Sequence, residues 1–190
     1  MNDVSPLATT PHPVKLRIED FVLLDQAGAF SDYAKSELIE GEILVMNAQH
    51  RPHARVKTKL IIAFAEALRA VDTSLEVLSE ASVAIPEHSL PEPDIVLTSE
   101  AQGSGFIPLS SVALMVEVAD STLNHDLQRK ARLYAQAGVA EYWVADVESR
   151  ILHQLWAPGD AGYAESRQCR FGERMIAETI PGLVIDTSAL

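Results

Sequence analysis

Val112-Ala-Leu-Met-Val-Glu-Val118 is the most strongly apolar strand that this sequence predicts, and a carboxylate lies near its end. Because side chains alternate between the two faces of a strand, Met115 and Glu117 share one face, and Leu114, Val116 and Val118 share the other. Apolar residues on both faces are typical of a strand at the centre of a sheet. A carboxylate in such a strand costs several kcal/mol unless a cation or hydrogen-bond donors compensate it. Glu117 is therefore the first candidate for a functional residue.

A second carboxylate, Asp94, begins another apolar segment, which follows a Pro-Glu-Pro bend and is also expected to be a central strand. Lys130 follows Glu117 by thirteen residues. On the helix predicted there, Lys130 falls within the apolar stripe that Leu127 and Tyr134 define, so it should point inward. A buried ion pair that tethers helix to sheet would explain this placement. The alternative is a lysine that stabilises charge beside a metal held by the two acids.

Apolar periodicity along the rest of the chain predicts a mixed α/β layer structure with one helix before a hairpin and a long amphipathic helix after it. Gly28 and Gly138 are expected to stop helices, and Asn124 to cap one. The predicted helices cover 18–27, 52–71 and 124–137. The predicted strands are two short ones within 37–46 around Glu40-Gly41, a pair at 75–78 and 81–85, strands at 94–97 and 112–118, a second pair at 141–147 and 151–156, and short edge strands at 163–169, 175–177 and 183–185, with a loop at 99–108.

The length of 190 residues and the 47% apolar content are typical of one globular domain, which we expect over 15–190 after a flexible, proline-rich lead-in over 1–14. No run of about 18 apolar residues occurs, and the N-terminus does not resemble a secretion signal. A cytoplasmic protein is therefore expected. Cys169 is the only cysteine, which excludes an intrachain disulfide and a cysteine-rich zinc site.

The charge balance opposes general affinity for nucleic acid or for an anionic membrane, since 15 Lys and Arg face 27 Asp and Glu and the net charge is −12. A polyanion would need a locally basic groove. Arg51, Arg55, Lys57 and Lys59 lie within nine residues that contain no acid. A solvated helix face is the commoner explanation of such a run, and a weak nucleic-acid-binding surface is the alternative.

Several motifs follow one another in a specific order over residues 15–160, and in that order they resemble the Uma2 family, formerly a domain of unknown function. Members of that family have the restriction-endonuclease-like PD-(D/E)XK fold, so the resemblance implies a central mixed β-sheet flanked by helices, with additional β-hairpins. The motifs are Glu37-Leu-Ile-Glu-Gly-Glu-Ile43, Pro93-Asp94, Val116-Glu-Val-Ala-Asp-Ser-Thr122, Asp126, Lys130 and Tyr134-Ala-Gln-Ala-Gly-Val-Ala-Glu-Tyr-Trp-Val144.

The resemblance also implies a site, in which Asp94 and Glu117 are metal ligands and Lys130 takes the place of the motif's lysine. The nuclease pattern has its lysine two residues after the glutamate, where this chain has Ala119, so the next helix would supply the lysine instead. Glu42 matches a family acid that would complete the metal site. Glu40 and Glu37 are alternatives to Glu42. An acid is also common on a surface strand without any functional role, which is the other explanation of Glu42.

His53 matches a histidine of the family and joins Arg55, Lys57 and Lys59 as a candidate nucleic-acid contact. An exposed histidine at the start of a helix is an equally good explanation. Tyr134 is expected to contact the core or a dimer partner rather than to stack on a base, as are Tyr142 and Trp143.

The oxygen ligands of this candidate site favour Mg²⁺ or Mn²⁺. The resemblance thus implies a metal-dependent endonuclease that hydrolyses phosphodiester bonds of nucleic acid, with DNA as the first expectation and a homodimer as the expected assembly. Two alternatives stand beside it: a catalytically inactive nucleic-acid-binding module, and a homodimeric scaffold that binds another protein. Residues after about 160 carry no chemistry that the sequence identifies.

Overall fold

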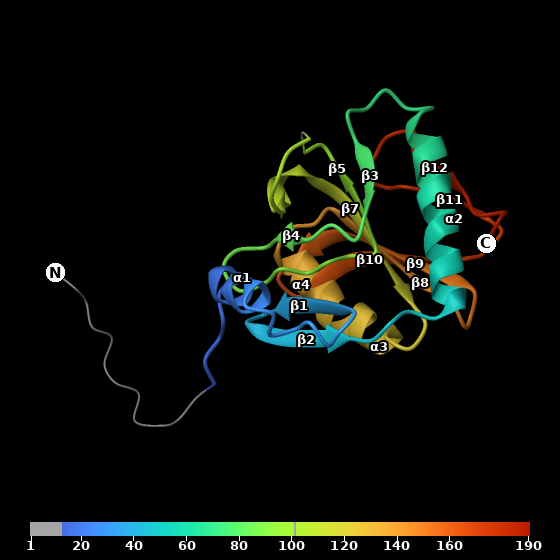
Figure 1. Cartoon of the computed structure of the whole chain (residues 1–190). Coiled ribbons are helices and arrows are strands. Elements are labelled where there is room, and N and C mark those ends of the chain that lie inside the picture. Colours follow the sequence, from blue (N-terminus) through green and yellow to red (C-terminus); the bar gives the residue numbers. More distant parts are fainter. Residues whose placement is uncertain (1–12, 101) are drawn as a thin grey trace.

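Six strands form the central sheet, in the order β10-β9-β8-β7-β5-β3 (Figure 1). The computed structural model describes residues 13–100 and 102–190, so residues 1–12 of the predicted lead-in lie outside the described part. β7 and β8 are parallel, and the other neighbours are antiparallel. This mixed sheet confirms the predicted fold class. The strands are β3 (Glu76–Ser79), β5 (Ile95–Thr98), β7 (Val112–Ala119), β8 (Glu141–Asp146), β9 (Ile151–Gly159) and β10 (Gly162–Arg170).

Helices pack against both faces of the sheet. On one face, Leu114 and Val116 of β7 share a core with Phe64 of α2 (Arg51–Leu68). On the other, Met115 shares a core with Tyr134 of α4 (Ala131–Gln136). The alternation predicted for this strand is therefore confirmed. α4 continues a short helix, α3 (Leu123–His125), through a π-helical turn over Asp126–Lys130.

The long helix α2 is amphipathic, as predicted. Its buried side chains recur at spacings of three and four, which places them along one face. The first turns of this buried face carry two polar residues, His53 and Lys57, and the buried residues after Lys57 are all apolar. A polar side chain is buried only where it finds partners, so this end of α2 points toward a polar site.

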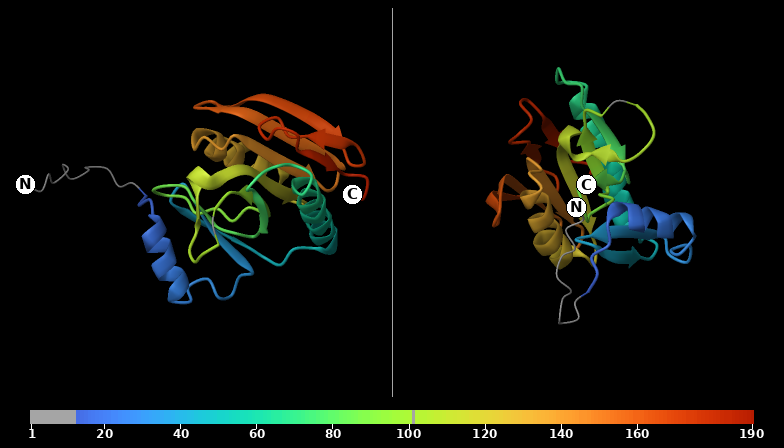
Figure 2. Two further views of the ribbon diagram at one scale, coloured as in Figure 1. Left: turned by 90° about the horizontal axis from the view of Figure 1, so that it is seen from above. Right: turned by 90° about the vertical axis from the view of Figure 1, so that its left-hand side faces the viewer.

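A hairpin of β1 (Lys35–Ile39) and β2 (Glu42–Met46) projects from the sheet together with α1 (Ile18–Gln26), on the side away from β9 and β10 (Figure 2). Glu40 and Gly41 connect the two strands with φ values of 52° and 84°. Positive φ at both central residues is the requirement of the tight hairpin turns that match strand twist. The predicted hairpin and its turn are confirmed.

Two local predictions are wrong. The strands expected as a pair at 75–78 and 81–85 do not pair with each other, because β3 pairs with β5 and β4 (Val83–Ala84) pairs in parallel with β6 (Ile107–Pro108), inside the predicted loop. Each strand thereby meets another apolar strand. Glu80, between β3 and β4 in the sequence, has a φ of 54°. Asn124 does not cap its helix, which begins at Leu123 after Thr122.

Residues after 160 complete the core. β10 forms one edge of the sheet, and β11 (Arg174–Ile176) and β12 (Val184–Asp186) place Met175 and Ile185 on the α2 side of the core. A short 3-10 helix, Leu109–Ser111, precedes β7. In the part of the chain that the structure describes, no helix combines the length and the apolar character needed to cross a membrane.

Candidate active site

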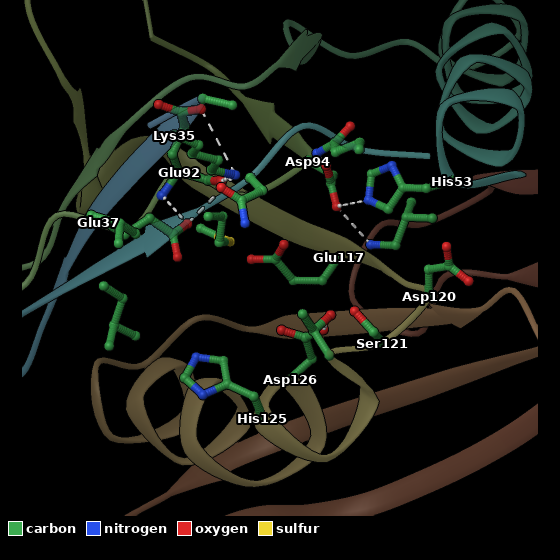
Figure 3. A pocket seen from close by; sticks show the side chains of 18 of the residues that line it. Lys35, Glu37, His53, Glu92, Asp94, Glu117, Asp120, Ser121, His125 and Asp126 are labelled. Carbon is green, nitrogen blue, oxygen red and sulfur yellow. Dashed lines mark hydrogen bonds and ion pairs between the residues drawn. The ribbon is translucent and has the colours of Figure 1, made fainter. Parts of the chain in front are cut away.

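Asp94 and Glu117 line the same pocket, which has a volume of about 810 Å³ (Figure 3). Asp94 directly precedes β5 and Glu117 lies in β7, so the antiparallel pairing of these two strands brings them to one end of the sheet. The β1–β2 hairpin and the segment 120–130 form the walls of the pocket. The structure thus brings together the two acids that the sequence singled out.

The Asp94 carboxylate is held by four donors. Its Oδ2 accepts from the backbone N–H of Val118 at 2.8 Å and lies 3.2 Å from His53 Nε2. Its Oδ1 accepts from Gln49 Nε2 at 3.3 Å and lies 3.5 Å from Lys57 Nζ. Burial raises the pKa of Asp94, but the hydrogen bond and charge of His53 outweigh it and hold the pKa well below its usual range. The Asp94 carboxylate is therefore ionised at neutral pH.

The Glu117 carboxylate is held through one oxygen. Its Oε1 accepts from Lys130 Nζ at 2.9 Å and from the Tyr134 hydroxyl at 3.1 Å. Within residues 13–100 and 102–190, no hydrogen bond reaches Oε2. Burial raises the pKa of Glu117 to about 8, against the lowering effect of Lys130 and with a further rise from Asp126 and Asp94. A bound cation would supply a partner for Oε2 of Glu117 and would compensate its negative charge.

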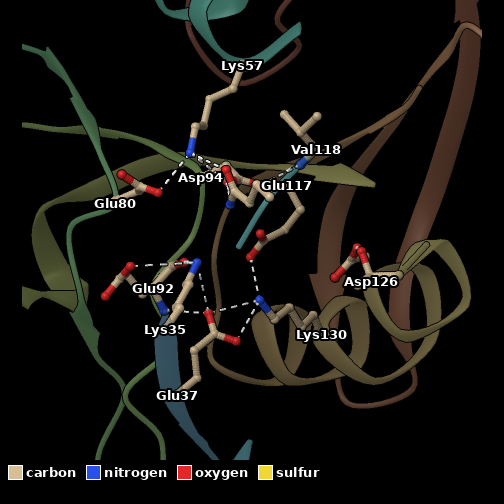
Figure 4. Close-up of polar contacts among 12 residues, drawn as sticks. Lys35, Glu37, Lys57, Glu80, Glu92, Asp94, Glu117, Val118, Asp126 and Lys130 are labelled. Atoms are coloured by element: carbon tan, nitrogen blue, oxygen red, sulfur yellow. Dashed lines mark hydrogen bonds and ion pairs between the residues drawn. The ribbon is translucent and has the colours of Figure 1, made fainter. Parts of the chain in front are cut away.

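Lys130 joins Glu117 to a third acid, Glu37 of β1 (Figure 4). Its Nζ lies 2.9 Å from Glu37 Oε2, while Lys35 Nζ lies 3.6 Å from Glu37 Oε1 and the Glu92 backbone N–H donates to that oxygen at 2.8 Å. Burial raises the pKa of Glu37, but the charges of Lys130 and Lys35 lower it below its usual value. Lys130 itself is 3% exposed, in agreement with its inferred inward direction.

Each of the two acids is held by one helix. His53 and Lys57 of α2 are four residues apart and reach Asp94, and Lys130 and Tyr134 are four residues apart and reach Glu117. Residues at this spacing lie on the same face of a helix. Lys130 ends the π-helical turn, a feature that occurs frequently at functional sites.

The structure does not bring Glu42 into this group. Glu42 begins β2 directly after the turn, its side chain is 67% exposed, and its Oε2 accepts from Arg129 Nη2 at 2.7 Å outside the pocket. Glu37 is the hairpin acid that lines the pocket. Alternation turns Lys35 and Glu37 to one face of β1, and Glu42 shares that face because it pairs with Ile39. It lies farther along the hairpin, at the turn, where its side chain is exposed and meets Arg129.

The four candidate nucleic-acid contacts of α2 do not form one surface. His53 and Lys57 are buried beside Asp94, Arg55 is exposed, and Lys59 bonds the backbone carbonyl of Ala189. In the basic run from Arg51 to Lys59, the solvated helix face accounts for Arg51 and Arg55, which are exposed. Contact between any of these residues and nucleic acid stays a prediction.

Several side chains at the site were not predicted from the sequence to belong to it. Lys35 and Gln49 are two of them. Tyr134 was expected in the core or at a dimer contact; it is buried in the core and also donates to Glu117. Strand alternation around Glu37 was the available signal for Lys35. Gln49 precedes α2 and carries no periodic signal.

Acids dominate the pocket. Three Lys and Arg side chains line it, Lys35, Arg129 and Lys130, against seven carboxylates, Glu37, Glu80, Glu92, Asp94, Glu117, Asp120 and Asp126. Mg²⁺ commonly binds through one or two carboxylates while it keeps several waters, so Asp94 and the free oxygen of Glu117 fit a hard divalent cation. Over the described residues, no group of three or more His, Cys, Asp or Glu side chains is placed to hold a metal ion, so an ion bound by Asp94 and Glu117 would take its other ligands from water or substrate.

Comparison with known proteins bears on the family and the fold of the chain. The family model Uma2, described as "Putative restriction endonuclease", matches residues 18–188. No curated protein matches. Among solved structures, the chain is similar to "a putative nuclease belonging to DUF820" from Anabaena variabilis ATCC 29413, with a TM-score of 0.66, 14% identity, and coverage of 94% of this chain and 93% of that chain. The likeness in structure shows a nuclease-like fold. The match of the family model to residues 18–188 shows that the chain belongs to the Uma2 family.

Proposed function

We propose that this protein is an endonuclease that hydrolyses phosphodiester bonds of nucleic acid and depends on Mg²⁺ or Mn²⁺. The observation that carries the proposal is the meeting of Asp94, Glu117 and Lys130 in one acidic pocket, with Lys130 Nζ 2.9 Å from Glu117 and one Glu117 oxygen without a hydrogen bond among the described residues. Membership of the Uma2 family supports it.

Asp94 and Glu117 are the residues that would hold the metal. When bound, the ion would supply a Lewis acid for the phosphate and lower the pKa of a water. The protein's own contribution is orientation: the donors from α2 fix Asp94, and Lys130 and Tyr134 both engage Oε1 of Glu117, which leaves Oε2 for a ligand. Preorganised groups of this kind cost no reorganisation during the reaction.

Lys130 would place its positive charge beside the phosphodiester. Burial lowers the pKa of Lys130, but the charges of Glu117 and Glu37 outweigh it and raise the pKa above its usual value, so the ammonium stays charged at all working pH values. A fixed cation stabilises negative charge that develops on phosphate oxygens. Glu37 pairs with both Lys130 and Lys35. These contacts fit a role in positioning Lys130 better than they fit a role as a metal ligand.

The test is a cleavage assay on single-stranded and double-stranded DNA and RNA with Mg²⁺ or Mn²⁺. We expect Asp94→Asn, which keeps the shape of the side chain, to lose roughly 1,000-fold in rate, because a metal ligand supplies several kcal/mol to the transition state. Asp72→Asn, at an exposed position outside the pocket, is the matched control.

Cleavage that survives Asp94→Asn would contradict the assignment. If wild type binds nucleic acid but cuts none of the four substrates, the inactive binding module is the better description; if it does neither, the protein-binding scaffold is. The expected homodimer and the cytoplasmic location stay predictions, the first of which sedimentation analysis would test.

A further inference from the structure

A second cavity, of about 520 Å³, lies beside the candidate active site; we call it the side groove. Aromatic residues form much of it. Phe21 and Phe30 stack on each other with ring centroids 5.3 Å apart and make its wall, whereas Tyr33 and Phe106 are 47% and 45% exposed. In the described part of the chain, no ring contact involves Tyr33 or Phe106. Two aromatic faces are therefore available to a ligand.

Polar side chains complete the lining of the side groove. They include Gln26, Ser31, Ser36 and Ser82, and none of these four makes a side-chain hydrogen bond within the described residues. The side groove therefore offers aromatic surface together with free donors and acceptors, a combination that suits a flat ligand with polar edges.

The side groove shares a wall with the candidate active site. Ala34, Lys35 and Glu92 line both cavities. The Lys35 ammonium is engaged, since it lies 3.6 Å from Glu37 Oε1 and 3.7 Å from Glu92 Oε1. With Asp25 and Glu92 also in its lining, the side groove disfavours a phosphate and favours an uncharged ring.

We propose that the side groove binds an unpaired base of the nucleic acid strand whose backbone lies in the active site. This inference rests on the proposed function and names its substrate class: a nucleic acid with a single-stranded segment. Bases inside a duplex are stacked and paired, so only an unpaired base can enter the side groove and stack on Tyr33 or Phe106. Aromatic faces accept any base, which makes the recognition independent of sequence.

The experiment measures equilibrium binding of a fluorescein-labelled single-stranded oligonucleotide and its duplex by anisotropy, with Ca²⁺ in place of Mg²⁺ and a gel to verify that the DNA stays intact. We expect wild type to bind the single strand more tightly than the duplex. Tyr33→Ala and Phe106→Ala should each weaken single-strand binding about tenfold, while Tyr33→Phe keeps it. Ile62→Ala, at an exposed apolar position on α2, should change nothing.

An oligonucleotide made of abasic residues separates base contact from backbone contact. On this probe the loss caused by Tyr33→Ala should vanish. The proposal is overturned if both alanine variants bind the normal single strand like wild type, if the loss persists on the abasic strand, or if wild type prefers the duplex or binds no nucleic acid. If Tyr33-dependent binding is found but no substrate is cut in Mg²⁺, the side groove stands and the proposed nuclease activity fails.

Discussion

Lys130 has a structural role beside the catalytic one that we propose, because its ammonium lies between two buried acids. Glu37 and Glu117 are 1% and 4% exposed, and both carboxylates lie 2.9 Å from its ammonium. Removing one partner of a buried ion pair leaves uncompensated charge. The two explanations of Lys130 that the sequence left open, tether and catalytic cation, are compatible in this geometry.

We therefore expect Lys130→Met to lower the free energy of unfolding by about 3–5 kcal/mol, measured by urea denaturation at neutral pH. Arg132→Met, at an exposed position of the same helix, should stay within about 0.5 kcal/mol of wild type. Equal small effects of the two changes would show that the buried ion pair contributes little to stability.

Glu117 should make the stability depend on pH. Its pKa is about 8 in the folded protein, because of burial, against about 4.3 in an unfolded chain. Because the folded state binds this proton more tightly, the proton on Glu117 contributes to the free energy of unfolding. That contribution is complete below about pH 4.3 and is lost as the pH rises to 8. Asp94, whose pKa is lowered despite its burial, acts with the opposite sign, but only below about pH 4.

Without divalent cations, the free energy of unfolding of wild type should therefore fall from pH 5 to pH 8 relative to Glu117→Gln, by at most about 1.4 kcal/mol per pH unit. Chemical denaturation in EDTA at a series of pH values measures this difference. Glu66→Gln, on the exposed side of α2, should follow wild type. Parallel pH profiles of wild type and Glu117→Gln would contradict the raised pKa.

The β1–β2 hairpin is the element that carries Glu37 into the site, and its turn depends on glycine. Gly41 has a φ of 84°, and a Cβ built there would lie 2.7 Å from Lys15 Cβ and 2.8 Å from Lys15 Cα. Both the backbone conformation and the close approach of the preceding segment exclude a larger side chain.

Gly41→Ala should lower the free energy of unfolding by about 1–3 kcal/mol, because the chain must shift at Lys15 or strain its backbone. Thermal denaturation followed by circular dichroism measures the effect. The control is Gly159→Ala, where the added Cβ would meet only the Gly162 carbonyl oxygen at 3.7 Å, an ordinary contact. If both variants melt alike, the turn tolerates alanine and the argument from Lys15 is wrong.

For the whole molecule, the net charge of −12 and the seven carboxylates of the pocket make nucleic acid an unfavourable ligand unless cations accompany it. We expect DNA to bind at least about tenfold more tightly in Ca²⁺ than in EDTA at the same ionic strength, as measured by anisotropy. Asp94→Asn should lose most of this gain, and Asp72→Asn should keep it. Equal affinity in Ca²⁺ and EDTA would show that the pocket does not bind DNA through a cation.

Local patterns were sufficient for most of the fold. The alternation in β7, the long apolar stripe of α2 and the Glu40-Gly41 turn each arise from neighbouring residues, so their elements could be predicted within a few positions. The inward direction of Lys130 followed from the same helical periodicity. Asp94 and Glu117 were identifiable because a charge in an apolar strand is conspicuous.

Which side chains complete the site depends on contacts between segments far apart in the chain. Glu37 and Glu42 share one face of the hairpin, and the way the hairpin packs places Glu37 at Lys130 and Glu42 at Arg129. Glu37 and Lys130 are 93 positions apart in the sequence. His53 meets Asp94 across 41 positions because α2 packs on the sheet with a polar end to its buried face. Local periodicity in the sequence shows which side chains are buried. The partner that compensates the charge of a buried side chain is decided by the tertiary structure, because that partner comes from a segment far away in the chain.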